Sequence, residues 1–304
     1  MTDSRSTLTL APWPEARRLC TLRLALLLCV LVGLAGCSLR VSYPFMDWWL
    51  GWKVRDYISL DQTQQQRLES TLTQFQRWHQ HTQLPLYAAD LLALHKRLQQ
   101  PQVLTPAELQ TYSQQSEAHW LTSLDYVLPE VRAMFMTISP VQWQEFTQAV
   151  LERSEEELEP FLESTPEKAS KLRQQRLEKS AKTWIGPLSE EQQHLIVDWS
   201  EAMTDLAVIR RLEQQRWIEQ ANQLYQQRHT LSEAAVQAQL RRLMAEESSF
   251  WLPEHQRLRE DNRQRSRQLV CELHASLSDK QKQHLLRSLH DLHRDLDFLF
   301  QKTL

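Results

Sequence analysis

The chain has 304 residues, a formal net charge of −3 at pH 7 and four glycines. Phosphate-binding loops and dinucleotide-binding turns need several glycines, because glycine readily adopts positive φ and allows close backbone approach, so both kinds of site are excluded. The lack of a basic excess argues against a nucleic-acid partner. No His-Glu-x-x-His motif occurs, so we expect no metal site, and we expect no other cofactor. No Gly-x-Ser-x-Gly motif occurs either, so a serine nucleophile of that type is absent.

The first 36 residues have the features of a secretory signal peptide. Arg17, Arg18 and Arg23 precede an uncharged run over 24–36. This run of 13 residues is shorter than the about 20 that a membrane-spanning helix needs, which disfavours an uncleaved signal anchor. Removal of 1–36 takes away four basic and two acidic residues, so the charge of the remaining chain becomes −5.

The end of this run, Leu34-Ala35-Gly36-Cys37, resembles the lipobox of bacterial lipoproteins. The resemblance implies cleavage between Gly36 and Cys37, two acyl chains on the Cys37 thiol and a third on its new amino terminus. Two or more acyl chains anchor a protein stably, so the first expected partner is a membrane. Ser38 stands where an aspartate commonly retains such lipoproteins at the inner membrane, which favours the outer membrane, facing the periplasm.

Three tryptophans, Trp48, Trp49 and Trp52, follow Cys37 by 11 to 15 residues. They would lie at the headgroup level of a bilayer, where indole rings are favoured. Alternatively they form the core face of the first helix, with Trp48 and Trp52 four residues apart and Phe45 on the same side. We favour the core interpretation, because large aromatic side chains mostly bury area.

A recurring motif predicts where the helices begin. It consists of an apolar residue, then Asp, Ser or Thr, two further residues, and Glu or Gln, which is the pattern of a capping box. The uneven spacing of its copies excludes a solenoid of fixed period. The five copies begin at Leu60, Leu104, Ile138, Leu188 and Leu277, and Leu231-Ser232 begins an incomplete sixth.

Good helix formers dominate the chain and alternating strand patterns are hard to find, so we predict an all-α fold. The expected architecture is an elongated multi-helix bundle of roughly 9–11 helices, some long and coiled-coil-like. The stretch 189–229 contains no glycine or proline and is predicted to be one helix of about forty residues. Its expected buried stripe is Leu195, Trp199, Met203, Leu206 and Ile209, and a coiled-coil-like seam is formed by Leu285, Leu289, Leu292, Leu296 and Leu299.

These patterns predict three segments: a signal peptide over 1–36, a lipidated N-terminus and tether over 37–44, and a helical domain over 45–304. Gly186-Pro187 is a natural helix end and marks a subdivision of the domain near 186–188.

Cys271 is the only cysteine outside the predicted signal peptide and lipidation site, so a disulfide within the mature chain is excluded. Val270, Leu273 and Leu277 are spaced as the buried stripe of a helix. Cys271 lies at the edge of that stripe, so we predict a buried hydrophobic side chain rather than a reactive thiol.

Histidines and glutamates offer candidates for a metal or catalytic site, but we expect none to form one, and we interpret His290, His293 and the glutamates as solvated. The pairs His79/His81 and His290/His293 lack the further ligand and the signature of a zinc site. Successive glutamates on a helix point in different directions, mostly to water, so they are not a catalytic pair. The acidic residues in question are Glu155, Glu156, Glu157, Glu159 and Glu163.

Several segments resemble a family of uncharacterised proteobacterial outer-membrane lipoproteins. They are residues 46–50, 54–60, 78–79, 84–88 and 277–281. The resemblance covers the whole mature chain but implies no activity. It departs at residues 42–45, Ser-Tyr-Pro-Phe, where a Tyr-Asn-Asn-like stretch is expected.

Two functional hypotheses follow. The first is a lipid-anchored, non-enzymatic binding or scaffold protein that uses a face or groove for an envelope protein or polymer. The second is an envelope hydrolase, acting for example on peptidoglycan, whose carboxylates converge only in three dimensions. The lack of glycine-rich loops favours the first. A pocket with a glutamate of strongly raised pKa would favour the second.

Overall fold

The computed structural model describes residues 39–302, and Gly36 and Cys37 lie outside this part of the chain. The described chain is all-α and has no strand, which confirms the predicted fold class. Its α-helices are α2 (Leu39–Ser42), α3 (Met46–Arg55), α4 (Gln62–Thr82), α5 (Leu84–Leu98), α6 (Pro106–Thr137), α7 (Pro140–Leu162), α8 (Pro166–Ile185), α9 (Glu190–Ala202), α10 (Ala207–Gln227), α11 (Glu233–Ala245), α12 (Pro253–Ala275) and α13 (Asp279–Gln301). The 3₁₀ helices are η1 (Tyr43–Phe45) and η2 (Glu247–Phe250).

All five predicted capping boxes form. In each, the side chain of the N-cap residue accepts a hydrogen bond from the amide three residues later, and the Glu or Gln side chain at that position accepts one from the N-cap amide. The N-cap residues are Asp61, Thr105, Ser139, Ser189 and Ser278. Ser232 caps α11 without a returning side chain, as expected for the incomplete copy.

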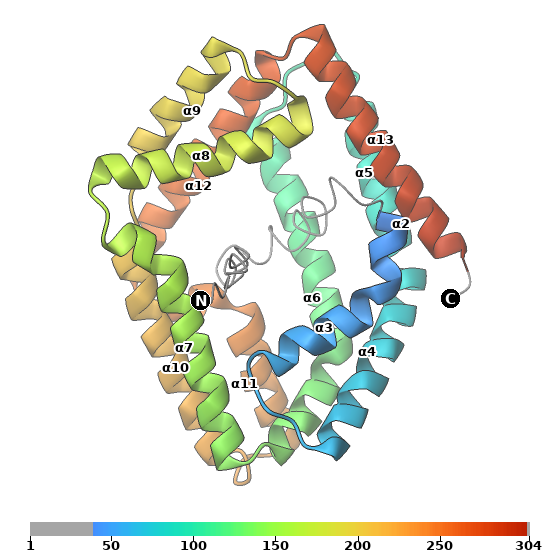
Figure 1. Ribbon diagram of the computed structural model, residues 1–304, viewed down its shortest axis with the longest axis vertical. Helices are drawn as coiled ribbons and strands as arrows, with labels where there is room; N and C mark the ends of the chain where they lie inside the picture. The colour runs from blue at the N-terminus through green and yellow to red at the C-terminus, as the bar shows by residue number, and fades with distance from the viewer. Residues whose placement is uncertain (1–38, 303–304) are drawn as a thin grey trace, which may run out of the picture.

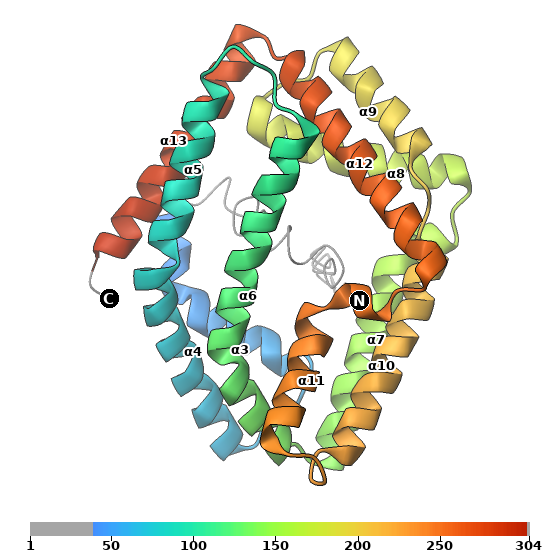
Figure 2. The same ribbon diagram turned by 180° about the vertical axis from the view of Figure 1, so that it is seen from behind.

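The helices pack mainly in pairs that follow one another around a frame (Figure 1). Helix α5 packs on α13, α13 on α8, α8 on α9, and α9 on α12. Helix α12 continues the circuit to α6, and α6 contacts α11 and α4. Helices α3 and α8 lie toward the viewer in Figure 1, whereas α6 and α12 lie toward the viewer in Figure 2. The frame therefore has two different faces.

The predicted leucine seam of α13 is largely buried. Leu296 and Leu299 are 5% and 1% exposed and pack against Leu84 of α5. Leu39 and Tyr43 belong to the same cluster and are each 4% exposed. The prediction that residues 37–44 form a tether is therefore wrong for residues 39–44. These residues form α2 and part of η1, because their apolar side chains complete the contact between α5 and α13.

The glutamines of four capping boxes form two reciprocal pairs, which we call the glutamine clasps. In the first clasp, Gln64 Nε2 donates to Gln142 Oε1 (3.3 Å) and Gln142 Nε2 donates to Gln64 Oε1 (2.6 Å). In the second, Gln192 Nε2 donates to Gln281 Oε1 (3.1 Å) and Gln281 Nε2 donates to Gln192 Oε1 (2.8 Å). The clasps join the start of α4 to the start of α7, and the start of α9 to the start of α13.

The clasps mark two halves of the molecule that repeat one arrangement. Gln64 donates to the carbonyl of Thr137 as Gln192 does to that of Ser276. Gln142 likewise donates to the carbonyl of Ser59, and Gln281 to that of Pro187.

Helix contacts repeat in the same way: α3 packs on α4 as α8 packs on α9, and α5 packs on α13 as α10 packs on α7. In Figure 1 the halves lie opposite each other, as if related by a two-fold axis along the viewing direction. Since α8 corresponds to α3, the boundary between the halves lies between α7 and α8. Gly186 does end α8, with φ of 78°.

We expect Gln192→Ala to lower the free energy of unfolding by about 1–3 kcal/mol, because the change leaves buried polar groups without a partner. Gln192 is fully buried. Gln193→Ala is the matched control, since Gln193 is exposed and makes only a 3.4 Å bond to the carbonyl of Leu188. The measurement is urea unfolding followed by circular dichroism. The double variant of Gln192 and Gln281 should cost less than the two single changes combined. Equal losses at Gln192 and Gln193 would contradict the clasp.

Candidate functional site

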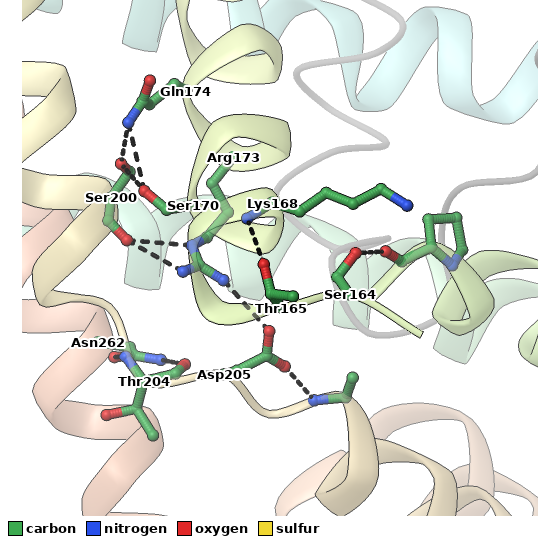
Figure 3. Close-up of polar contacts among 12 residues, drawn as sticks. Ser164, Thr165, Lys168, Ser170, Arg173, Gln174, Ser200, Thr204, Asp205 and Asn262 are labelled. Atoms are coloured by element: carbon green, nitrogen blue, oxygen red, sulfur yellow. Dashed lines mark hydrogen bonds and ion pairs between the residues drawn. The ribbon is translucent and has the colours of Figure 1, made fainter. Parts of the chain in front are cut away.

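A cavity of about 880 Å³ lies where the end of α7, the start of α8, the end of α9 and the start of α10 meet (Figure 3). Its volume is within the range of about 300–1,000 Å³ that is usual for ligand pockets. A smaller hollow of about 520 Å³ lies beside Arg40, Arg294 and Phe298, close to the end of the described chain. We consider the larger cavity as the candidate site and call it the α7–α10 cleft.

The cleft lies at an interruption that the sequence does not predict. The expected forty-residue helix is wrong: α9 ends at Ala202, α10 begins at Ala207, and residues 203–206 are not helical. Asn262 of α12 binds both main-chain groups of Thr204, accepting from its amide (3.0 Å) and donating to its carbonyl (2.8 Å). A side chain distant in sequence therefore takes the bonds that helix continuation would use.

The segment after Thr204 is held from the other side by α8. Arg173 donates to the carboxylate of Asp205 (3.3 Å) and twice to the carbonyl of Ser200 (3.1 and 3.2 Å). The second carboxylate oxygen of Asp205 accepts from the amide of Ala207 (2.8 Å) and so caps α10. Figure 3 shows these bonds converging on the chain between α9 and α10.

Two serines at this site are structural rather than nucleophilic. The hydroxyl of Ser200 lies 2.7 Å from that of Ser170 and accepts from Gln174 Nε2 (2.9 Å). Ser200 is fully buried, and its hydroxyl donates to the carbonyl of Val197 (2.9 Å). A nucleophilic serine needs an adjacent general base, and none of these partners is one.

The remaining lining is apolar with a mixed set of charges. Phe161, Leu162 and Met203 face the cleft, and Val208 at its edge is 57% exposed. Leu212, one turn along α10, is 44% exposed and extends the apolar edge. The charged lining residues are Glu167, Lys171, Arg173, Glu201 and Asp205.

Three carboxyl groups of the described chain have a lowered pKa, whereas a general acid needs a raised one. The hydroxyl of Thr165 lowers the pKa of Glu167 in the cleft by hydrogen bonding. Ser59 does the same to Glu145, and Arg97 with Thr105 lowers the pKa of Glu108 to about 2. A general acid working near neutral pH needs a raised carboxyl pKa, so these three groups do not fit that role.

The predicted site residues at the N-terminus have different outcomes. Gly36 and Cys37 lie outside the described residues. Trp48, Trp49 and Trp52 are 64%, 43% and 40% exposed, so their favoured assignment to the core is wrong. The opposite side of the same helical segment, including Leu39, Tyr43 and Gly51, is buried instead. Apolar residues occur at helical spacing on both sides of this segment, and only the packing shows which side faces inward.

The predicted burial of Cys271 is confirmed. Its side chain is 7% exposed, and burial raises the pKa of the thiol. The predicted stripe is wrong at Val270, which is 43% exposed, whereas Leu269 is 3% exposed. Helix α12 packs on both α6 and α9, so Cys271 faces one neighbour and Leu269 the other.

The histidine pairs and the acidic stretch considered from the sequence are not brought together into a metal site within residues 39–302. No group of three or more His, Cys, Asp or Glu side chains there is placed to hold a metal ion. His79 instead bonds to two tyrosine hydroxyls, a network that the sequence analysis missed. Glu155, Glu156, Glu159 and Glu163 are exposed. Glu157 pairs with Arg210 (3.0 Å), which holds α7 against α10.

Within residues 39–302, no helix is both long enough and apolar enough to cross a bilayer. Comparison with curated proteins and with solved structures finds no significant match. Residues 56–257, more than half of the chain, match a family of unknown function, DUF6279. The chain therefore belongs to the DUF6279 family.

Proposed function

We propose that the mature protein is a lipid-anchored, non-enzymatic binding protein of the cell envelope that takes a polypeptide segment into the α7–α10 cleft. The observation that carries the proposal is the construction of the cleft. Four polar side chains of its lining, Ser170, Arg173, Gln174 and Asp205, are bonded to one another, to the fully buried Ser200 or to main-chain groups. These bonds give the cleft a fixed shape, and its apolar edge is then available to contact the bound polypeptide.

The chemistry of the lining favours an amphipathic peptide over a highly charged ligand. Val208 and Leu212 present apolar surface at the edge, and Phe161 lies beneath the guanidinium of Arg176 at 4.5 Å. Lys171 and Glu201 add charges of both signs. Apolar contact supplies affinity and the few charges orient the bound chain.

The proposed anchor is Cys37, through the lipobox resemblance of residues 34–37, with the outer membrane as the expected location. The described helices begin at Leu39, two residues after Cys37. A lipid at this position would confine the cleft to the membrane surface and raise its local concentration near envelope partners.

Site-specific photocrosslinking tests the binding site. With benzoylphenylalanine in place of Val208, we expect a discrete polypeptide adduct in intact cells. The same substitution at Val270 is the matched control, since Val270 is also exposed but lies on α12. Glu201→Arg, a charge reversal at an exposed lining residue, should weaken the Val208 adduct. No adduct, or equal adducts at both positions, would contradict the proposed cleft.

A separate experiment tests whether the protein lacks hydrolytic activity. Purified protein incubated with peptidoglycan should release no fragments. Release that is abolished by Glu201→Gln would establish a hydrolase and overturn the proposal.

A further inference from the structure

The helical segment that follows Cys37 carries an exposed apolar stripe. Helices α2, η1 and α3 follow one another without a gap from Leu39 to Arg55. Five of the fourteen exposed large hydrophobic side chains of the described residues lie within residues 41–52. They are Val41, Phe45, Trp48, Trp49 and Trp52, with exposures of 60%, 62%, 64%, 43% and 40%.

These five side chains share one side of the segment. At 100° per residue their positions fall within an arc of about 100°, the width of a typical apolar stripe. The other side is already used by the fold, since Leu39 and Tyr43 are buried against α5 and α13. The segment is therefore apolar on two sides, of which the protein covers one. We call the uncovered side the tryptophan stripe.

The fold itself does not require such a stripe. Helix α8 occupies the corresponding place in the second half, and both α3 and α8 lie on the face shown in Figure 1. None of the described exposed large hydrophobic side chains is on α8. The stripe is thus a property of the first half alone, the half that follows Cys37.

We infer that the tryptophan stripe lies in the headgroup region of the bilayer that receives the lipid of Cys37. This inference rests on the proposed lipid anchor. Only Ser38 separates Cys37 from Leu39, and two residues of chain span at most about 7 Å. The acyl chains therefore enter the bilayer close to the start of α2. The stripe itself is about 17 Å long at 1.5 Å rise per residue.

Residue chemistry also selects a lipid surface. Tryptophan is enriched at membrane interfaces, where its ring contacts apolar chains and its N–H remains near water. Residues 39–55 contain Arg40, Lys53 and Arg55 against Asp47; Arg40 is paired with Asp295 and Lys53 with Asp56. The Nζ atom of Lys53 lies 4.4 Å from the ring centroid of Trp52. A cation at the edge of the stripe suits anionic headgroups.

The test places an environment-sensitive label on the stripe of the intact lipidated protein. In a Cys271→Ser background, Trp48→Cys is labelled with a nitrobenzoxadiazole thiol reagent, and Cys37 is blocked by its own lipid. Trp52→Cys is a second stripe position. Val270→Cys is the control: it is 43% exposed and belongs to α12, the helix that lies toward the viewer in Figure 2. Circular dichroism verifies folding of each variant.

The labelled proteins are placed in vesicles of phosphatidylethanolamine and phosphatidylglycerol, with or without nitroxide-labelled lipid. An interfacial helix lies about 5–10 Å into the headgroup and acyl boundary, so both stripe labels should shift to the blue and lose about half or more of their fluorescence to the lipid quencher. The Val270 label should do neither. A blue shift without lipid quenching would mean that protein, such as a second copy, covers the stripe, and would overturn the inference.

Failure of the inference and failure of the anchor give different results. Labelled palmitate should enter the wild type and not Cys37→Ser. If the protein carries palmitate and floats with vesicles while the stripe labels stay in water, the anchor stands and the inference is wrong. If no palmitate enters the wild type, the lipid anchor is wrong and the inference falls with it.

Discussion

Replacing Glu213 with alanine is expected to lower the free energy of unfolding by about 3–5 kcal/mol, the largest single effect that we predict. Glu213 of α10 forms an ion pair with Arg259 of α12, and the two residues are 6% and 8% exposed. His255 Nδ1 lies 3.7 Å from the other carboxylate oxygen of Glu213. The guanidinium of Arg259 also lies 4.5 Å from the ring centroid of Trp251. Loss of the carboxylate leaves this buried cation without its acidic partner.

Two further variants separate the broken pair from general disruption. Glu213→Met combined with Arg259→Met removes both charges and should recover most of the loss, because a buried ion pair is often replaceable by apolar residues of similar volume. Glu260→Ala is the matched surface control: Glu260 is paired with Arg267 but half exposed, and the change should cost at most about 1 kcal/mol. Urea unfolding measures all three. A loss below 1 kcal/mol for Glu213→Ala would refute a buried, energetically coupled pair.

The second large effect is a dependence of stability on pH between about 6.5 and 4, which we assign to His79. Burial lowers the pKa of His79 from 6.5 to about 4. Its Nδ1 lies 3.0 Å from the hydroxyl of Tyr43, and its Nε2 lies 3.2 Å from that of Tyr87. Burial also raises the pKa of Tyr87, so its hydroxyl stays protonated. This network joins η1 to α4 and α5.

The sign follows from proton uptake. Below pH 6.5 the unfolded chain protonates His79, whereas the folded chain does so only near pH 4. The contribution of neutral His79 is therefore complete above pH 6.5 and is lost as the pH falls to about 4. At 1.36 kcal/mol per pKa unit it amounts to roughly 2–4 kcal/mol.

His79→Gln removes the titration and should flatten the slope of unfolding free energy against pH between 6.5 and 4. His81→Gln, at an exposed position on the same helix, is the control and should leave the slope unchanged. The measurement is urea unfolding at half-unit steps of pH. Burial also lowers the pKa of His274, so part of the slope should persist in His79→Gln. An unchanged slope in that variant would reject the assignment.

The capping glutamines have a second role, the bonds between two capping boxes, which was not predicted from the sequence. A Glu or Gln three residues after a cap predicts the local hydrogen bond in either case. Gln64, Gln142, Gln192 and Gln281 form clasps, because an amide can accept locally and still donate to a distant partner. Glu108, the only glutamate of the five, has acceptor oxygens alone and binds Arg97 instead (2.5 Å). Glutamine in place of glutamate at this position was therefore the sequence feature that could have indicated a contact between two capping boxes.

The sequence by itself determined the all-α class, the five helix starts that carry a capping box, and the burial of most of the leucine seam and of Cys271. These features depend on bonds between residues three or four positions apart or on the period of one helix, so each segment contains its own information. Only the tertiary structure decided that α9 ends at Ala202, where the α7–α10 cleft forms. That interruption depends on Asn262, 58 residues beyond Thr204. The residue pattern around Thr204 cannot predict a partner so distant in sequence. The same holds for the tryptophan stripe, because spacing places side chains on one side of a helix but packing decides which side is covered.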